Sequence, residues 1–476
     1  MQQQRQPVAA RRMVLAKFLV AASPVPGHVG PMLNVARMLI EAGHEVVVNT
    51  GMRFRGQARA TGARFVPLKD DAEIDVQEVV ADPRRMKLQP GPEMVRFDIE
   101  HVFANPIPDQ VRGIDAILRD FPADAILADM IFMGTLALWS RPREQRPALV
   151  NCGISVLTHS DPTMAPFGLG LPPATSEEGL TQYTALKQQV REEFGDFANA
   201  TVNRNLLLAG GKEITSDYMD AIVTDTDLYL QFSVPSFEYP RAAMPESVRF
   251  VGAMLPPPTT QFEKPEWWGE LKSGRPVVVV TQGTVANMDL GQLMGPALAG
   301  LATEDMLVIA ATGGPSLDSV PGPKPTNARI VDFVPFDKLL PYASVLVTNG
   351  GFGAINHALS LGIPVIGAGK TEDKGEITAR VEWAGVGVNL NTSMPSPMMV
   401  RDAVRRTLND PAIYVNVRTM QAEYARYDAL GSVLTALEEV VADAENRLLL
   451  DFANARSGLR MTIEDPKRGV VVPMRR

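Results

Sequence analysis

Cysteine is nearly absent from this chain of 476 residues, in which Cys152 is the only one. A single cysteine excludes an intrachain disulfide and fits a reducing compartment, so the sequence indicates a cytoplasmic protein. Cys152 follows the apolar run 148–150, and we therefore expect a buried structural thiol and not a nucleophile.

Long apolar runs and a surplus of basic residues are also missing. The first apolar stretch, residues 13–22, includes Lys17; it is too short to cross a bilayer and is typical of a core strand. The 46 Lys and Arg residues are outnumbered by 54 Asp and Glu residues, which gives a net charge of -8. Because an acidic surface disfavours nucleic acids and anionic membranes, we expect no nucleic-acid partner and no stable membrane association.

Clusters of metal ligands are missing as well, because no His, Cys and Asp residues recur at the spacing that metal sites use. The triplet Asp225-Thr226-Asp227 resembles the acidic pair that holds a metal–nucleotide complex in some transferases. It directly precedes an expected strand, however, and we interpret it as a solvated turn. The sequence therefore predicts no metal site.

The length of the chain exceeds what one compact core usually holds, so two domains are expected. A proline-rich stretch at 255–260 can continue neither a helix nor a central strand, and it marks the boundary. The expected divisions are a disordered leader (1–12), a first domain (13–254), a linker (255–265), a second domain (266–430), and a C-terminal helix and tail (431–476) that returns to the first domain.

Alternating strand and helix patterns predict the fold class. The apolar run 18–22 is followed by a loop at 23–30, a helix opened by Pro31 and closed by Gly43, and a second apolar run at 45–49. This βαβ unit indicates a parallel sheet, and a second series of such units begins at residue 277. We therefore predict an α/β protein with two tandem Rossmann-like, doubly wound domains and a cleft between them. Further strands are expected at 65–66, 125–128, 148–151, 228–232, 306–311, 330–334, 345–347 and 365–366, and one helix in the polar insertion 170–211.

Two glycine-rich turns follow strands of the second domain. One comprises Gly350, Gly351, Phe352 and Gly353, with a helix expected from Ala354. Glycines before a helix N-terminus let the backbone approach an anion, and a diphosphate is the obvious ligand. The other turn, 281–284, offers N–H groups and hydroxyls. Tight turns alone would explain either loop, but two such loops in one domain favour phosphate binding.

A nicotinamide dinucleotide is not expected. The turn after the first strand lacks the G-x-G-x-x-G spacing. Asn49 and Thr50 stand where a ribose-binding acid would end the second strand. The phosphate-binding features therefore belong to the second domain alone.

Several segments together resemble the UDP-glycosyltransferase superfamily (glycosyltransferase family 1), in particular its microbial natural-product members. The resemblance spans residues 14–390 and implies a GT-B fold with an inverting mechanism, a first domain that binds the acceptor and a second that binds a nucleotide-sugar donor. It implies no cofactor besides that co-substrate, and no metal. The segments that carry it are Pro26–Leu33, Phe333-Val334-Pro335, Thr348–Gly353, Gly362-Ile363-Pro364 and Thr371–Lys374.

The resemblance also assigns roles to single residues. It implies that His28 is the general base, oriented by Asp129. The implied donor-site positions are Gly283, Thr284, Phe333, Val334, Asn349, Gly350, Gly351, Phe352, Gly353, His357, Asp373 and Lys374. Among these, Phe333 stacks on the base, Thr284 and Gly351 contact the diphosphate, and Asp373 binds sugar hydroxyls.

Three donor positions depart from the family's pattern. Asn349 replaces a diphosphate-binding His, His357 replaces a ribose-binding Glu, and Lys374 replaces a sugar-binding Gln. Donor identity therefore stays open between UDP-sugars and dTDP-sugars.

The residues themselves support the assignment of His28. A histidine titrates near neutrality and suits a general base, and His28 lies in the loop after the first strand. Asp129 ends a strand that should share this sheet edge, whereas Asp124 should lie at the opposite edge. His44 follows a helix end whose negative dipole should place it, and we assign no role to it, His101 or His159.

The acceptor is expected to be a small, hydrophobic, hydroxylated molecule. Met130, Phe132 and Met133 follow Asp129 and could line its pocket, although they fit an ordinary helix core equally well. The sequence thus predicts an inverting transferase that moves a hexose from a nucleotide sugar to a hydroxyl. A GT-B nucleotide-sugar epimerase and a non-catalytic sugar-nucleotide-binding helper remain alternatives, and the oligomeric state stays open.

Overall fold

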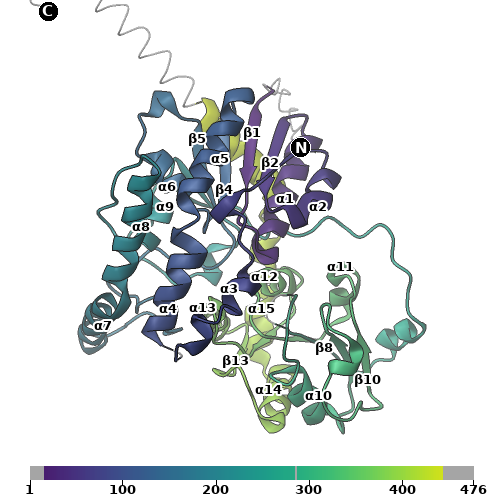
Figure 1. The fold of residues 1–476 in the computed structure, drawn as a ribbon. Coiled ribbons are helices and arrows are strands. Elements are labelled where there is room, and N and C mark those ends of the chain that lie inside the picture. The colour runs from purple at the N-terminus through teal and green to yellow at the C-terminus, as the bar shows by residue number, and fades with distance from the viewer. Residues whose placement is uncertain (1–14, 90, 285–286, 443–476) are drawn as a thin grey trace, which may run out of the picture.

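The computed structural model describes residues 15–89, 91–284 and 287–442 and contains two α/β domains, one above the other in Figure 1. The leader expected at 1–12 and the tail at 448–476 lie outside these residues. Within the described part of the chain, no helix is long and apolar enough to cross a membrane.

The N-terminal domain is built on a seven-stranded sheet with the order β3-β2-β1-β4-β5-β6-β7, in which all neighbours are parallel. The central strands are almost continuously apolar, as parallel strands covered on both faces usually are. The strands are β1 (Lys17–Ala21), β2 (Glu45–Thr50), β3 (Arg64–Pro67), β4 (Ala125–Asp129), β5 (Ala148–Gly153), β6 (Leu228–Gln231) and β7 (Val248–Phe250).

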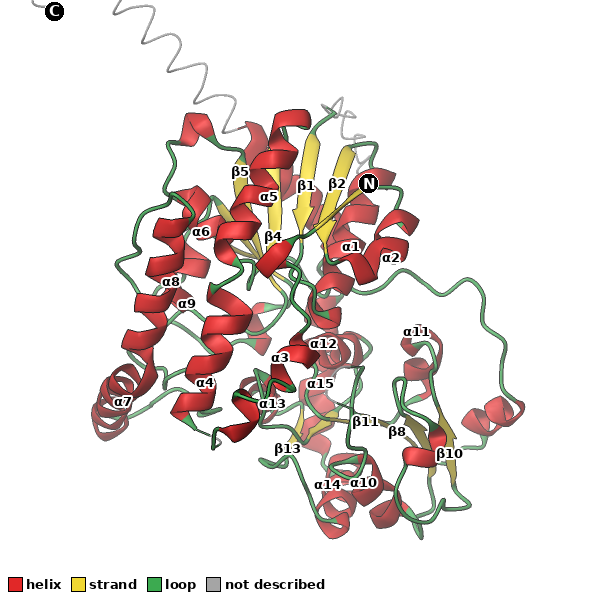
Figure 2. Cartoon of the chain, viewed as in Figure 1, coloured by secondary structure: helices red, strands yellow, loops and turns green. Residues whose placement is uncertain are grey.

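Helices cover both faces of this sheet (Figure 2). They are α1 (Pro26–Glu41), α2 (Arg55–Ala60), α3 (Val76–Val80), α4 (Pro92–Asp98), α5 (Ile107–Asp120), α6 (Gly134–Trp139), α7 (Glu177–Val190), α8 (Asp196–Leu208) and α9 (Tyr218–Thr224). The polar insertion 170–211 therefore holds two helices, α7 and α8, and not the single helix expected. A π-helical turn at Arg191–Gly195 joins them.

Helix α1 begins five residues earlier than predicted. Pro26, and not Pro31, occupies the first position, because Val25 has the extended backbone of an N-cap (φ -114°, ψ 128°). Pro31 lies inside the helix, where it omits one hydrogen bond toward the carbonyl of Gly27. As a result, His28 is in the first turn of a helix and not in a loop.

The C-terminal domain has a six-stranded parallel sheet with the order β10-β9-β8-β11-β12-β13. Its strands are β8 (Val277–Thr281), β9 (Leu307–Ala311), β10 (Ala328–Val331), β11 (Val345–Thr348), β12 (Val365–Gly367) and β13 (Gly387–Asn389). Its helices are α10 (Met294–Leu301), α11 (Phe336–Leu339), α12 (Phe352–Ser360), α13 (Lys374–Trp383), α14 (Pro397–Asn409) and α15 (Pro411–Tyr424). The two sheets confirm the predicted tandem of doubly wound domains.

Element boundaries differ from the predictions in two places near the expected donor site. Strand β10 ends at Val331, and Phe333 leaves the sheet with its N–H donated to the Asp332 carboxylate at 2.8 Å. Helix α12 begins at Phe352 and not at Ala354, since Gly351 has the extended backbone of an N-cap. The short edge strands β7 and β13 were not predicted, because their sequences, Val-Arg-Phe and Gly-Val-Asn, contain no apolar run.

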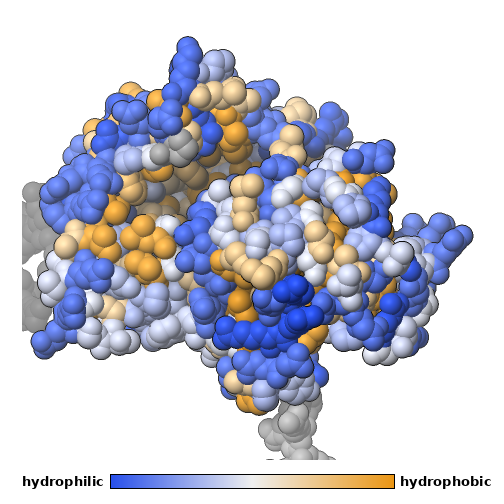
Figure 3. All heavy atoms as spheres, turned by 90° about the horizontal axis from the view of Figure 1, so that it is seen from below, coloured by the Kyte–Doolittle hydropathy of each residue, from blue (hydrophilic) through white to orange (hydrophobic). Residues whose placement is uncertain are grey.

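The segment around the expected linker, residues 251–265, carries no helix or strand and runs along the right of Figure 1. Beyond α15 the chain is helical again at 429–442. Val433, Ala436 and Leu437 of that helix are buried in the core of the N-terminal domain. The described end of the chain thus packs on the first domain. Figure 3 shows a mainly hydrophilic face, with hydrophobic side chains in scattered patches and inside a hollow.

The surroundings of His44 and Asp227 differ from those that the sequence predicts. His44 is buried, with its ring edge against Phe18 (centroids 5.0 Å apart) and its Nδ1 accepting the Ala16 N–H at 3.3 Å. Burial lowers the pKa of His44, so packing and not the helix dipole determines its place. Asp227 lies in no solvated turn, because its carboxylate binds Arg146 at 2.5 Å and the Leu149 N–H at 2.8 Å.

Candidate active site

Each sheet has one topological switch point, which is the place where the strand order reverses direction. The pair His28 and Asp129 lies at one of them, and the two glycine-rich turns lie at the other. In the N-terminal domain the switch lies between β1 and β4, and in the C-terminal domain between β8 and β11. Ligands of doubly wound sheets bind outside the carboxyl ends of strands at such points. His28 follows β1 and Asp129 ends β4, while the two glycine turns follow β8 and β11.

His28 and Asp129 form a hydrogen-bonded pair, as the sequence predicts. The Nδ1 atom of His28 lies 2.8 Å from Oδ1 of Asp129. The Asp129 side chain is fully buried and also accepts the N–H groups of Ser23 at 2.6 Å and Ile131 at 3.0 Å. Because a carboxylate can only accept hydrogen bonds, the His28 ring donates its Nδ1–H to Asp129. The lone pair of Nε2 is therefore available, and 22% of the side chain is exposed.

Other residues near this pair occupy structural positions. Asp124 accepts the Lys17 N–H at 2.7 Å at the opposite edge of the sheet, as predicted. Met130, Phe132 and Met133 are buried among the core residues of the N-terminal domain. Core packing accounts for their burial, and their contact with an acceptor stays a prediction.

The glycine turn after β11 leaves backbone open to a ligand. Gly350 has a φ of 100°, and a Cβ there would lie 2.9 Å from Thr378, so only glycine fits. A Cβ on Gly351 or Gly353 would meet nothing within 4 Å. The first N–H groups of α12 have no partner within the helix, and they offer an anion site. Phe352, in contrast, is buried and packs against Phe237, with ring centroids 6.5 Å apart.

The turn after β8 is tied to the first one. Asn349 donates its side-chain amide to the Gln282 carbonyl at 2.5 Å. Gly283 has a φ of 73°, and its carbonyl accepts the Asn287 amide at 3.0 Å. Thr284, beside it, is exposed. Asn349 thus holds the two glycine turns together through an uncharged hydrogen bond. The family pattern has a histidine at this position.

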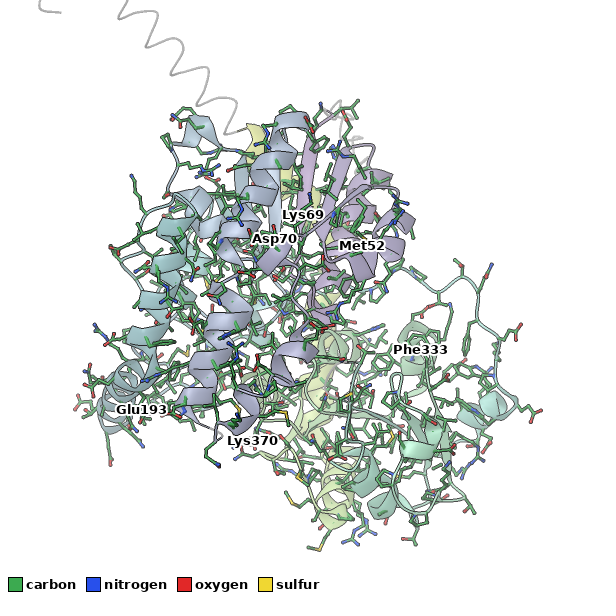
Figure 4. All side chains as sticks on the ribbon, in the orientation of Figure 1. Met52, Lys69, Asp70, Glu193, Phe333 and Lys370 are labelled. Carbon is green, nitrogen blue, oxygen red and sulfur yellow. The ribbon has the colours of Figure 1, made fainter. Side chains whose placement is uncertain are left out.

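The positions expected around the nucleoside differ in exposure. Phe333 is 68% exposed and lies on the C-terminal domain, near α11 in Figure 4, whereas Val334 is buried. His357 of α12 is buried, with its ring centroid 6.3 Å from that of Phe336. Burial lowers the pKa of His357, so the imidazole is neutral at pH 7. Phe333 thus offers an exposed ring of the kind that can stack on a nucleobase.

The positions expected around the sugar lie where the two domains meet. Asp373 accepts a hydrogen bond from the hydroxyl of Ser155, which follows β5 of the other domain. Lys374 is buried and contacts the Glu372 carboxylate through its Nζ. Burial lowers the pKa of Lys374 to about 8. Because Ser155 follows β5 and Asp373 follows β12, the carboxyl edges of the two sheets face each other.

Sequence reasoning missed Ser155 and Asn287, and it included Gln282 only as a member of the turn 281–284. Ser155 stands four residues after the predicted strand 148–151, and its place after that strand was the only signal it carried. Gln282 accepts the N–H groups of Leu293 and Met294 at 3.2 and 3.0 Å, and so fixes the start of α10. Among the described residues, no group of three or more His, Cys, Asp or Glu side chains could hold a metal ion.

Known proteins resemble the chain over most of its length. Residues 293–440 match the family described as erythromycin biosynthesis protein CIII-like, C-terminal domain. The chain is 40% identical to 4'-demethylrebeccamycin synthase of Lentzea aerocolonigenes over 90% of its own length and all of that protein. It is 32% identical to UDP-glycosyltransferase 2 of Phaeomoniella chlamydospora, over 89% and 95% of the two chains.

Solved structures share the fold. The calicheamicin glycosyltransferase CalG4 superposes with a TM-score of 0.68 at 21% identity, over 90% of this chain and 99% of that one. The spinosyn rhamnosyltransferase SpnG, complexed with thymidine diphosphate, gives 0.63 at 17% identity, over 89% and all of the chains. The chain therefore belongs to the UDP-glycosyltransferase superfamily and is a glycosyltransferase with the GT-B fold.

Proposed function

We propose that the enzyme transfers a hexose, with inversion and without a metal, from a UDP- or dTDP-sugar to a hydroxyl of a small apolar acceptor. The pair formed by His28 and Asp129, 2.8 Å apart at one switch point, carries this proposal. A second switch point with two glycine turns lies in the other domain, whose carboxyl edge faces the first. We further propose a cytoplasmic enzyme, as the lone buried cysteine suggests.

The chemical step needs a base for the acceptor. The Nε2 atom of His28 takes the proton of the acceptor hydroxyl while the oxygen attacks C1 of the sugar. The bond between C1 and the phosphate oxygen breaks on the opposite face, and its electron pair leaves with the nucleoside diphosphate. Asp129 stabilises the imidazolium that forms. One displacement of this kind inverts C1.

The leaving diphosphate needs positive charge or N–H donors. The N-terminus of α12, beside the open faces of Gly351 and Gly353, supplies N–H groups and the positive end of the helix dipole. Thr284 adds an exposed hydroxyl. Together with Lys374, these groups replace the charge that a divalent ion would bring, so we expect activity to survive EDTA. Loss of activity in EDTA with recovery in manganese would contradict the metal-free step.

The relatives support the choice of substrates. Their names include a UDP-glycosyltransferase and a synthase of 4'-demethylrebeccamycin, and one structural neighbour binds thymidine diphosphate. The neutral His357 is compatible with either nucleotide. We propose that Phe333 stacks on the base and that Asp373 binds sugar hydroxyls.

A binding screen followed by a transfer assay tests the proposal. Thermal shift with UDP, dTDP and their glucose and rhamnose derivatives identifies the donor, since a ligand at about a hundred times its Kd adds roughly 2.7 kcal/mol of stability. The stabilising donor is then incubated with a panel of apolar phenols. We expect a glycoside and a free nucleoside diphosphate. A new nucleotide sugar without any glycoside would indicate an epimerase instead, and binding without either product a helper protein.

A further inference from the structure

Helix α13 presents a row of polar side chains to the N-terminal domain. Asp373 immediately precedes the helix, and Glu376 and Arg380 follow at intervals of three and four residues, which places all three on one side. Each of them binds a group of the N-terminal domain. The partners of Asp373 and Glu376 belong to residues 154–171, which follow β5 and are named the docking loop here.

The middle of the row binds the backbone of the docking loop. The Oε1 atom of Glu376 accepts the N–H groups of Gly168 and Gly170, both at 2.8 Å. Both glycines have positive φ, 98° and 62°, which turns two nearby N–H groups toward one oxygen. A Cβ on Gly170 would lie 2.8 Å from the carbonyl oxygen of Gly375. The loop therefore touches α13 directly, and glycine is required at the contact.

A buried cluster of four charges anchors the far end of the row. Arg380 binds Glu238 at 2.9 Å and Glu376 at 3.0 Å, and Arg241 lies 3.7 Å from Glu238. These side chains are at most 7% exposed, and two acids balance two bases. Glu238 also accepts the Leu157 N–H at 2.7 Å. Buried charges held by several partners are rigid, because moving one leaves the others unpaired.

The near end of the row is the sugar site. Ser155, two residues before the anchored Leu157, donates its hydroxyl to the Oδ2 atom of Asp373. This bond constrains the direction in which the carboxylate can accept hydrogen bonds from a ligand. The glycine turns at Gly283 and Gly351 are not part of the row.

We propose that the docking loop is a positioning device for the donor sugar, in which Ser155 orients the Asp373 carboxylate and the cluster of Glu376, Arg380 and Glu238 holds Ser155 in place. The proposal rests on the proposed binding of the sugar by Asp373. If so, the N-terminal domain helps to determine the affinity for the donor sugar. The affinity for the nucleoside diphosphate without a sugar should depend on the glycine turns and not on the docking loop.

Two variants disturb the device without removing a charge. Ser155→Ala deletes the hydroxyl, and Gly170→Ala pushes the loop away from α13. Gly210→Ala is the matched control, since Gly210 also has a positive φ (76°) but nothing within 4 Å of its Cβ. Calorimetry measures the Kd of UDP-glucose and UDP, and of dTDP-glucose and dTDP, for the full-length enzyme and each variant.

We expect Ser155→Ala and Gly170→Ala to raise the Kd of the sugar nucleotide by roughly fivefold and to change that of the nucleoside diphosphate by less than about twofold. The double variant should be no weaker than the worse single one, because both act through Asp373. Gly210→Ala should match the wild type. A merely structural loss would weaken both ligands together, and that result would overturn the proposal.

Asp373→Asn separates this proposal from the proposed function. If it weakens sugar-nucleotide binding while Ser155→Ala and Gly170→Ala do not, the positioning device is refuted and the function stands. If Asp373→Asn changes nothing, or the wild type binds neither sugar nucleotide, the proposed sugar site is wrong and the inference fails with it. Should Gly170→Ala not fold, Ser155→Ala decides alone.

Discussion

The two switch points of this enzyme have the same topology and opposite chemistry. At the first, between β1 and β4, the buried carboxylate of Asp129 forms hydrogen bonds with the His28 ring and with two backbone N–H groups. At the second, between β8 and β11, glycines expose backbone, and a Cβ on Gly351 or Gly353 would meet nothing. We therefore expect the first site to act through side chains, and the second through N–H groups and open space.

This difference predicts which kind of substitution should inactivate each site, the acceptor site of the N-terminal domain or the donor site of the C-terminal domain. A side-chain site loses its function when one group is deleted, since no neighbour can replace the Nε2 atom of His28. A backbone site keeps its N–H groups after most substitutions and fails only when added bulk fills the open space. Deletions should therefore break the acceptor half, and additions the donor half.

The largest effect is expected from His28→Ala. Removing the base should lower kcat on the order of 10²–10⁴-fold, the usual contribution of general base catalysis. The Kd of the donor should stay near that of the wild type, because His28 belongs neither to the C-terminal domain nor to the docking loop. The control is His101→Ala, whose ring stacks on Phe97. Turnover near the wild-type level in His28→Ala would remove His28 from the mechanism.

The next effect tests the open donor half. Gly351→Val should raise the Kd of UDP or dTDP on the order of a hundredfold, about 2.7 kcal/mol, because the side chain occupies the space beside the helix N-terminus. Its backbone (φ -63°, ψ 125°) accepts valine without strain, so Tm should barely change. Gly56→Val, which is equally open, is the control. Unaltered diphosphate affinity would show that the anion lies elsewhere.

A smaller effect is expected at His357. A neutral imidazole has one acceptor nitrogen, whereas a carboxylate accepts from both ribose hydroxyls. His357→Glu should therefore shift the ratio of kcat/KM toward ribonucleotide over 2′-deoxyribonucleotide donors by about 1–2 kcal/mol. Paired kinetics with UDP-glucose and its 2′-deoxy form measure the shift. Identical ratios in the wild type and the variant would place the ribose away from residue 357.

The smallest effect concerns Lys374, a side-chain cation in the backbone-dominated half. Burial lowers its pKa to about 8, so the ammonium is present below that pH and lost above it. Affinity for the anionic donor should therefore decline as pH rises through about 8, by about 1 kcal/mol, the attraction of two charges 4 Å apart in water. Lys374→Gln should abolish this decline. A wild-type decline that persists in the variant would assign it to another group.

Much of this comparison could be predicted from the sequence. The alternation of apolar runs and helical periods predicted both sheets, and strand ends placed His28 with Asp129 and the glycine turns with each other. Local order sufficed, because the carboxyl ends of parallel strands always share an edge. The start of α1 was missed because two prolines competed for it, and only the backbone at Val25 decides between them.

The contacts between the domains could not be predicted. Ser155 and Asp373 are 218 residues apart, and Gly168 and Glu376 are 208 apart. No local sequence pattern indicates either contact, because a serine after a strand and a glutamate in a helix are both common in sequences without such contacts. Burial of Arg380 was equally hidden, since a lone arginine in a helix normally indicates an exposed face.

The stereochemistry of the product tests the central claim most directly. The enzyme is incubated with UDP-α-glucose and an apolar phenol, and proton NMR measures the coupling constant at the anomeric position. Single displacement by an acceptor oxygen deprotonated by His28 predicts a β-glucoside from the wild type and far slower formation of it by His28→Ala. An α-glucoside, or an epimerised nucleotide sugar without glycoside, would contradict the account.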